Sequence, residues 1–191
     1  MKPVIAPVER SLIEAELSPE RFVRPTNFLE NEIYIINGND CPNVMMEIGR
    51  LREVSFRAGG GGTGKETDVD NFDMGRYAYQ QLIVWNPEDK EIVGGYRFAL
   101  CADNRDEHGE YHLSTSEIVE YSEKLKTEIF PTTIELGRSF VQPLYQPRAE
   151  NRRNLFSLDN LWDGLGALTV LFPQIEYFFG KITMYPTYNT E

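Results

Sequence analysis

The sequence predicts an α/β fold built around a mixed sheet, and three observations lead to that class. Apolar residues recur at helical spacing through residues 42–57. Two apolar runs, 79–85 and 91–100, are separated by the turn-forming residues 86–90, which is the pattern of a β-hairpin. A further strand pattern covers residues 132–141 and follows a segment with helical spacing. Helices therefore alternate with strands, some of which are joined as a hairpin.

The length of 191 residues favours a single domain over residues 1–191, with an N-terminal extension at residues 1–27. The hydrophobic content of 41% is typical of a globular chain, and the net charge of −11 argues against a general nucleic-acid binder. The sequence contains no apolar run long enough for a membrane span and no signal-peptide core. Its two cysteines, Cys41 and Cys101, fit a reducing compartment, so we expect a cytoplasmic protein.

The first half of the chain predicts a short helix at residues 8–17 and a strand at residues 32–36. Turn-forming residues 37–40 close that strand. The next helix, at residues 42–57, is predicted from apolar positions three and four residues apart: Val44, Ile48, Leu51 and Val54. The residues that follow, 58–75, are polar and rich in glycine and predict a loop.

The middle of the chain holds the hairpin and then a polar connection at residues 102–113. Residues 115–125 have the amphipathic spacing of a helix. Either Ser114 or Ser116 can cap this helix, because a serine hydroxyl accepts a hydrogen bond from the free N–H groups of the first turn.

The last third begins with the strand at residues 132–141 and continues through a basic loop at residues 146–153. Residues 155–171 predict a helix, and residues 175–184 predict a late strand. Turn-like residues, 185–191, end the chain. We expect the chain to be a piece of a longer protein, truncated at its C-terminus; the alternative is a natural polar tail.

Two charged residues, Glu135 and Arg138, lie inside the strand pattern at residues 132–141. A charge in a buried strand is costly unless it is paired, so these residues indicate either an ion network or an active site. Residues three positions apart on a strand point to opposite faces, so Glu135 and Arg138 each need another partner. The partners that we expect are Asp70, Asp73 and Arg97.

A glycine run at residues 59–65 has most of the pattern of a phosphate-binding P-loop. A P-loop also needs a strand before it, and a hydroxyl residue and a helix after it, whereas Glu66 follows this run. We interpret the run as the hinge of a loop that closes over substrate, or as a simple connector. In the acidic stretch 66–73, Asp68, Asp70 and Asp73 suggest a calcium loop, but Phe72 occupies one of the ligand positions and Gly75 is out of register, so we expect no metal site.

Five motifs then follow one another in order: Arg52-Glu53-Val54-Ser55-Phe56-Arg57, Gly62-Thr63-Gly64, the acidic stretch, Val93-Gly94-Gly95-Tyr96-Arg97, and Glu135-Leu136-Gly137-Arg138-Ser139-Phe140-Val141. Two later segments extend the match: Leu161-Trp162-Asp163-Gly164-Leu165 and Phe179-Gly180-Lys181-Ile182-Thr183-Met184. From about residue 28 to its end, the chain resembles the GNAT-fold N-acyltransferases that use acyl carrier protein. The resemblance is nearest to the ornithine-lipid and glycine-lipid branch, called hemolysin-like, which is related to the acyl-homoserine-lactone synthases.

The resemblance implies a GNAT-like fold, with a mixed, largely antiparallel twisted sheet flanked by helices. It also implies an acyltransferase that moves a long acyl chain, 3-hydroxylated or not, from acyl carrier protein or coenzyme A to the α-amine of a small amino acid in aminolipid synthesis. No cofactor is bound, because the thioester is itself the acyl donor. The loop after Val141 is longer and more basic than in ornithine-specific members, so glycine and ornithine both remain open as acceptors.

The resemblance also assigns roles to residues. The implied catalytic residues are Glu135, Arg138, Asp70 and Asp73. The implied substrate-binding residues are Arg52, Arg97, Phe72, Phe140 and Val141. Glu135 orients the amine and accepts its proton, or it is only part of an ion network. Arg97 and Arg138 bind the amino-acid carboxylate, or Arg52 and Arg97 clamp the acidic loop 66–73 over the site. Backbone N–H groups near Phe140–Val141, freed by a bulge in the strand, hold the oxyanion.

The basic loop contributes Arg148, Arg152 and Arg153, which suit the phosphate of a phosphopantetheine arm and the acidic face of a carrier protein. The alternative is an ordinary solvated loop. The partners implied are acyl carrier protein, an amino-acid acceptor, an O-acyltransferase acting next, and peripheral contact with the inner membrane surface. Two other functions stay open: an autoinducer synthase, and a non-catalytic domain that binds carrier protein or membrane.

Overall fold

The computed structural model describes residues 1–147 and 152–182. Its centre is a six-stranded sheet in which the strands follow one another in space in the order of the sequence. The strands are β1 (Phe22–Pro25), β2 (Glu32–Asn37), β3 (Gln80–Asn86), β4 (Glu91–Leu100), β5 (Thr133–Val141) and β6 (Tyr177–Gly180). Neighbouring strands are antiparallel, except for β5 and β6, which are parallel. The prediction of a mixed, largely antiparallel sheet is confirmed.

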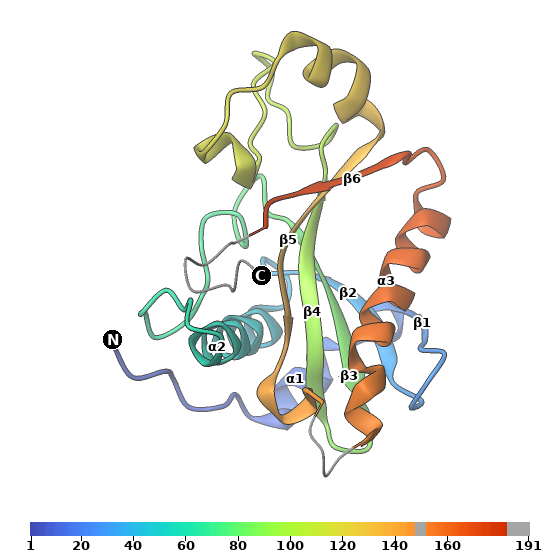
Figure 1. Cartoon of the computed structure of the whole chain (residues 1–191). Helices are drawn as coiled ribbons and strands as arrows, with labels where there is room; N and C mark the ends of the chain where they lie inside the picture. Colours follow the sequence, from blue (N-terminus) through green and yellow to red (C-terminus); the bar gives the residue numbers. More distant parts are fainter. Residues whose placement is uncertain (148–151, 183–191) are drawn as a thin grey trace, which may run out of the picture.

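Helices cover both faces of this sheet (Figure 1). They are α1 (Arg10–Glu16), α2 (Pro42–Ala58) and α3 (Ser157–Leu171). Successive side chains of a strand point to opposite faces, and β3 divides its side chains accordingly. Ile83 and Trp85 join the buried cluster beneath α1 and α2, whereas Leu82 and Val84 join the cluster beneath α3. The chain is therefore a three-layer α/β structure.

Two sequence predictions differ from the structure. β1 was not predicted, because its four residues are too few to show an alternating pattern. Residues 115–125 do not form the predicted helix; Ser114–Glu117 is a 3-10 turn, and a π-helical turn follows at Leu125–Ile129. The apolar residues Ile118 and Val119 of the predicted stripe are exposed, so no neighbouring surface stabilises a helix there.

The N-terminal segment supports α2. Cys41, at the N-cap of α2, makes no capping hydrogen bond with its side chain. Instead, the carboxylate of Glu16 accepts hydrogen bonds from the backbone N–H groups of Asn43 (3.1 Å) and Val44 (2.8 Å). Free N–H groups at a helix N-terminus carry partial positive charge, which a carboxylate stabilises. The cap of α2 therefore comes from a residue in α1, far away in the sequence.

β5 contains a bulge beside β4. The register places Gly95 opposite Phe140 and Arg97 opposite Gly137, so β5 has one residue more than β4 between the two pairs. Arg138 lies in the bulge with φ of 52°, a conformation that is uncommon for a residue with a side chain. The bulge turns the side chain of Arg138 away from the regular alternation of the strand.

The glycine pair in β4 allows its neighbouring strands to approach closely. A Cβ atom on Gly94 would lie 2.4 Å from the carbonyl oxygen of Phe140, and one on Gly95 would lie 2.4 Å from the carbonyl oxygen of Leu82. Both distances are too short for any side chain. The Gly-Gly pair is therefore a requirement of the sheet at the level of the bulge.

Candidate functional site

Asp73 is the centre of a buried ion network. Its side chain is completely buried, and its Oδ1 accepts hydrogen bonds from Arg52 (2.9 Å) and Gln81 (3.1 Å). The same oxygen lies 3.2 Å from the guanidinium of Arg97. Its Oδ2 accepts the backbone N–H of Asp70 at 3.0 Å. One carboxylate therefore joins α2, β3, β4 and the acidic loop.

Asp70 connects this network to the bulge of β5. Its Oδ1 accepts a hydrogen bond from Arg97 at 2.6 Å, and its Oδ2 accepts one from Arg138 at 3.3 Å. The second nitrogen of the Arg138 guanidinium, Nε, pairs with Asp68 at 3.1 Å. Partial burial raises the pKa of Asp70, but the hydrogen bond and the charge of Arg97 outweigh it and hold that pKa below its usual value. Burial wins at Asp68, where it raises the pKa above the usual value despite Arg138.

One predicted partner of Arg138, Asp70, is thus present, together with Asp68, which was not predicted as a partner. The partners of Glu135 differ from all those predicted. Glu135 is completely buried and forms no ion pair among the described residues. Its Oε1 accepts hydrogen bonds from the hydroxyl of Ser114 (2.8 Å) and the backbone N–H of Thr115 (3.1 Å). Its Oε2 accepts the hydroxyl of Tyr79 at 2.5 Å. The expectation that Asp70, Asp73 or Arg97 would pair with Glu135 is wrong, because neutral donors from two other segments reach it first.

Tyr79 links the two parts of the site. Its hydroxyl donates to Glu135 and accepts the backbone N–H of Ser114 at 2.8 Å. Its ring lies 5.2 Å from the guanidinium carbon of Arg97, within the range of a cation–π contact. Burial, and then the negative charge of Glu135, raise the pKa of Tyr79 far above its usual value, so the hydroxyl stays protonated. The Arg97 network and the Glu135 network therefore share one buried aromatic residue.

Sequence reasoning missed three members of this site: Tyr79, Asp68 and Gln81. Tyr79 and Gln81 occur in a segment that reads as an ordinary apolar strand, and their roles depend on contacts with distant segments. Asp68 is in the acidic stretch, and only the structure shows that it is 2% exposed and paired with Arg138, whereas Glu66 nearby is exposed. A polar residue at an inward position of a buried strand is the signal that could have found Gln81.

The predicted substrate-binding residues lie at different depths. Phe72 contacts the network from the side, with its ring 5.5 Å from the guanidinium carbon of Arg97. Phe140 is buried under α2, and Val141 packs toward α3. Arg138 and Asp70 keep 32% and 28% of their side-chain surfaces exposed, whereas the Arg97 side chain is only 3% exposed. A ligand that arrives from solvent would therefore meet Arg138 and Asp70 before Arg97.

The outer edge of β5 is open beside the bulge. The pairing of β6 with β5 ends at Leu136, and no other described strand pairs with residues 137–141 on that side. A strand edge without a partner presents backbone N–H and C=O groups. The bulge that was expected on this strand is present, and it lies directly before Phe140–Val141.

The glycine run is held in place by a buried glutamate. Glu53 accepts hydrogen bonds from the backbone N–H groups of Thr63 (2.9 Å) and Gly64 (2.8 Å), from the Thr63 hydroxyl (2.7 Å), and from Arg57 (2.7 Å). Burial alone would raise its pKa, but these hydrogen bonds lower the pKa of Glu53 to about 2. The backbone donors that a P-loop offers to phosphate are here bound to a carboxylate, in agreement with the rejection of nucleotide binding.

The basic loop can be described only in part. Arg148 lies outside the described residues. Arg152 and Arg153 begin the 3-10 turn Arg152–Phe156, which leads directly into α3.

Two other kinds of feature are absent from the described residues. No helix in residues 1–147 or 152–182 is long and apolar enough to cross a membrane. Within the same ranges, no three His, Cys, Asp or Glu side chains are grouped as metal ligands.

Two known proteins have sequences similar to that of this chain. The chain is 53% identical to a glycine N(alpha)-acyltransferase of Phocaeicola vulgatus over 192 residues, which cover 100% of this chain and 59% of that protein. It is 54% identical to a glycine N(alpha)-acyltransferase of Bacteroides thetaiotaomicron over 190 residues, which cover 99% of this chain and 56% of that protein. The chain thus spans less than three fifths of the length of these relatives. No solved structure matches it.

The family comparison agrees with the fold. The model of the acetyltransferase (GNAT) domain matches residues 51–153, which include the C-terminal half of α2, the ion network, the Gly-Gly pair, and all of β5 with its bulge. The six-stranded, mostly antiparallel sheet between helices has the architecture that this family implies. From its sequence, its sheet and its matched region, the chain belongs to the acetyltransferase (GNAT) domain family.

Proposed function

We propose that this chain forms the catalytic part of an N-acyltransferase that transfers a long acyl chain from a thioester donor to the α-amine of glycine. The observation that carries the proposal is the juxtaposition of two accessible charges of opposite sign, Arg138 and Asp70, at the open edge of β5. Free glycine carries one carboxylate and one ammonium group, and these two side chains are complementary to them. The names of the relatives support the same acceptor.

The chemistry assigned to this site has three parts. Arg138, with Arg97 behind it, binds the carboxylate of the amino acid, because guanidinium groups bind carboxylates in a fixed fork geometry. A neutral amine must attack the thioester carbonyl, so a proton must leave the ammonium group. The C–N bond then forms, the C–S bond breaks, and the pantetheine thiolate leaves and takes up a proton. Backbone N–H groups of β5 at Phe140–Val141 stabilise the oxyanion that forms on the carbonyl oxygen.

Glu135 is the base in this proposal, and it acts from a buried position. Its carboxylate is fixed by three neutral donors and forms no ion pair within residues 1–147 and 152–182. Glu135 can therefore act on the amine without first breaking an ion pair to an arginine. Because Glu135 is completely buried, the proton reaches it through a water or after a local opening of residues 114–115.

The donor in this proposal is an acyl group on the phosphopantetheine arm of acyl carrier protein, and Arg148, Arg152 and Arg153 bind the carrier. Coenzyme A carries the same arm, so the natural donor is identified by comparing kcat/KM for the two acyl donors. The acylated product is a lyso-aminolipid on which an O-acyltransferase acts next, in a cytoplasmic reaction at the inner membrane surface. We expect kcat/KM to be higher for palmitoyl-carrier protein than for palmitoyl-coenzyme A.

A direct assay tests the proposal. The purified chain is incubated with palmitoyl-carrier protein and equal concentrations of glycine and ornithine, and the products are identified by mass spectrometry. We expect N-palmitoylglycine. Formation of acyl-ornithine instead would correct the acceptor. Binding of the carrier protein without any product from the chain, or from a version extended to the length of its relatives, would identify a non-catalytic binding domain.

The role of Glu135 is tested with a matched pair of substitutions. Glu135→Gln removes the charge and keeps the size, and we expect it to lower kcat by about 100-fold or more. Glu128→Gln makes the same change at an exposed position and leaves the rate unchanged. If Glu135→Gln keeps most of the rate while circular dichroism shows a folded protein, Glu135 has an architectural role and the base lies elsewhere.

A further inference from the structure

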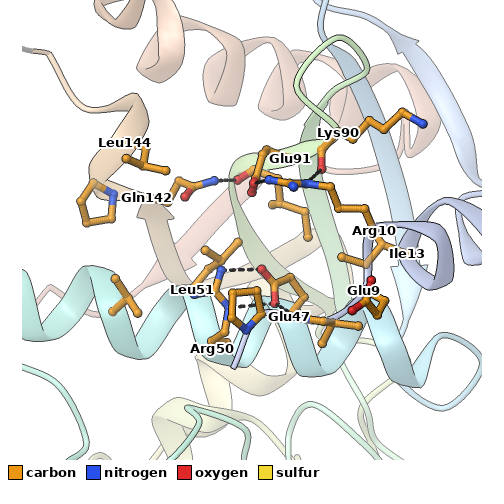
Figure 2. Close-up of a pocket in the computed structure, with 15 residues that line it drawn as sticks. Glu9, Arg10, Ile13, Glu47, Arg50, Leu51, Lys90, Glu91, Gln142 and Leu144 are labelled. Atoms are coloured by element: carbon orange, nitrogen blue, oxygen red, sulfur yellow. Dashed lines mark hydrogen bonds and ion pairs between the residues drawn. The ribbon is translucent and has the colours of Figure 1, made fainter. Parts of the chain in front are cut away.

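A groove on the α2 side of the sheet has no role in the chemistry described above. It has a volume of about 510 Å3 and lies between the N-terminal segment, α2, the start of β4 and the residues after β5 (Figure 2). This volume is within the range of about 300–1,000 Å3 that small-molecule sites occupy.

The floor of the groove is apolar. Ile13, Leu51 and Ile92 line it and belong to the buried cluster that also contains Phe140. Leu144, with 64% of its surface exposed, forms part of the wall beside the end of β5. Phe140 itself does not line the groove, but its side chain packs in the same buried cluster that forms the floor.

The charges around the groove cancel one another. Its lining includes three basic and three acidic side chains, Arg10, Arg50, Lys90, Glu9, Glu47 and Glu91. Arg50 pairs with Glu47 at 2.5 Å, Arg10 pairs with Glu91, and Lys90 pairs with Glu14 at 3.0 Å. Each basic group thus has a carboxylate partner, which leaves no cation to attract a phosphate. The surroundings favour an uncharged ligand with a large apolar part.

The position of the groove indicates which part of the substrate it can bind. The open edge of β5 runs from Arg138, where the amino acid binds in the proposed function, to Val141. The groove begins directly beyond this edge, at residues 142–144. A thioester carbonyl held at Phe140–Val141 would thus have the acceptor on one side and the groove on the other.

We infer that this groove binds the hydrocarbon tail of the acyl donor. The inference rests on the proposed function, and it assigns the apolar floor of α1, α2 and β4 to the recognition of chain length. A bound methylene gains free energy in proportion to the apolar surface that it removes from water. Long acyl groups should therefore bind more tightly than short ones, up to the length at which the groove is filled.

The test compares two donors that share one arm: palmitoyl-pantetheine and acetyl-pantetheine. The variant is Leu144→Asp, which places a charge on the groove wall at an exposed position where folding does not depend on it. The matched control is Leu171→Asp at the end of α3, an exposed leucine that is not among the residues lining the groove. Calorimetric binding of a non-reactive palmitoyl-pantetheine thioether provides a second readout that does not need turnover.

We expect Leu144→Asp to raise KM for palmitoyl-pantetheine, and Kd for its thioether, by about tenfold, with little change for acetyl-pantetheine and none in Leu171→Asp. An equal loss for both donors would overturn the inference, because it would show that the groove holds the pantetheine arm. An unchanged Kd for the palmitoyl thioether would also overturn it. Failure of the unmodified chain to acylate glycine, with chain-length-dependent binding intact, would overturn the proposed function and leave the groove assigned.

Discussion

Asp73 and Glu135 are both completely buried carboxylates in one site, yet their surroundings differ. Asp73 lies between the guanidinium groups of Arg52 and Arg97. Glu135 is surrounded by a tyrosine hydroxyl, a serine hydroxyl and a backbone N–H, all of them neutral. Arginine keeps its proton at any physiological pH, so Asp73 always has cationic partners. The comparison separates a carboxylate held by ion pairs from one held by neutral donors, to which we assign the proton transfer.

Two more carboxylates extend this comparison into a series. Glu53 is held by one guanidinium, from Arg57, together with neutral donors of the glycine run. Glu16 is held at the start of α2 by backbone and side-chain N–H groups alone. Fewer cationic partners and greater exposure should mean a smaller cost when the interaction is removed. Four substitutions test this order, beginning with the largest expected effect.

Arg52→Met should destabilise the protein by about 3–5 kcal/mol, because it leaves the carboxylate of Asp73 buried with one cation fewer. Urea denaturation followed by circular dichroism measures the change. Arg76→Met, at an exposed position, is the control and should change the free energy of unfolding by less than about 0.5 kcal/mol. A loss below about 1 kcal/mol for Arg52→Met would show that Arg97 alone neutralises Asp73.

Glu53→Gln should destabilise the protein by about 1.5–3 kcal/mol at neutral pH, because hydrogen bonds to a charged group are replaced by weaker ones. The pKa of Glu53 in the folded protein is about 2, below its ordinary value of 4.5. The unfolded chain therefore binds the proton more tightly, and the contribution of Glu53 to stability is complete above pH 4.5 and falls as the pH decreases toward 2.

The measurement for Glu53 is the free energy of unfolding as a function of pH. The difference between the unmodified protein and Glu53→Gln should shrink as the pH is lowered from 5 toward 2. Amide hydrogen exchange of Thr63 and Gly64 should become faster in the variant, because their N–H groups lose their acceptor. A difference in stability that is constant over this pH range would contradict the pKa assignment.

Tyr79→Phe should destabilise the protein by about 1–2 kcal/mol, because Glu135 loses a donor and the N–H of Ser114 loses an acceptor. The ring that contacts Arg97 is kept, so the ion network should survive. Thermal unfolding measures stability, and the glycine acylation assay measures kcat. Tyr121→Phe is the control, since its hydroxyl contacts Thr115 and not Glu135. If both variants lower kcat equally, the hydrogen bond from Tyr79 to Glu135 makes no specific contribution to the reaction.

Glu16→Ala should have the smallest effect, about 1 kcal/mol, which is typical for the loss of a helix N-cap. Chemical denaturation measures it, and Glu9→Ala, an exposed acid in the same segment, is the control. If Glu16→Ala and Glu9→Ala are equally stable, water satisfies the N–H groups of α2 once the Glu16 carboxylate is removed. Glu16 then does not stabilise the fold, and the comparison is limited to Asp73, Glu53 and Glu135.

The regular elements were largely predictable from the sequence. The helical spacing of Val44, Ile48 and Leu51 predicted α2 to within one residue of its observed end. The hairpin of β3 and β4 and the strand β5 were predicted from apolar runs and turn residues, and all three are confirmed. Each depends on local spacing, which a single sequence displays directly. The 115–125 helix is not formed, because Ile118 and Val119 have no apolar surface to pack against.

The charged residues of the candidate site were predictable from the sequence, but most of their hydrogen-bond and ion-pair partners were not. The charges in the acidic stretch and in β5 indicated an ion network, and the pairing of Arg138 with Asp70 is observed. The partner of Glu135 was not predictable, since Tyr79 looks like any aromatic residue beside a strand. Hydrogen bonds between residues more than fifty positions apart depend on the strand register, and the pairing of β3 with β4 and of β4 with β5 places Tyr79 level with Glu135.

The sequence by itself determined the order of the elements, the Gly-Gly pair, and the presence of acids and arginines that had to meet because isolated buried charges are too costly. Only the tertiary structure decided which acid meets which base. It assigned two arginines to Asp73 and, among the described residues, none to Glu135, because Tyr79, directly before β3, and Ser114, in the 3-10 turn after β4, donate hydrogen bonds to Glu135. Charge pairing is a requirement that composition imposes, whereas the choice of partner is a matter of distance and burial in the folded chain.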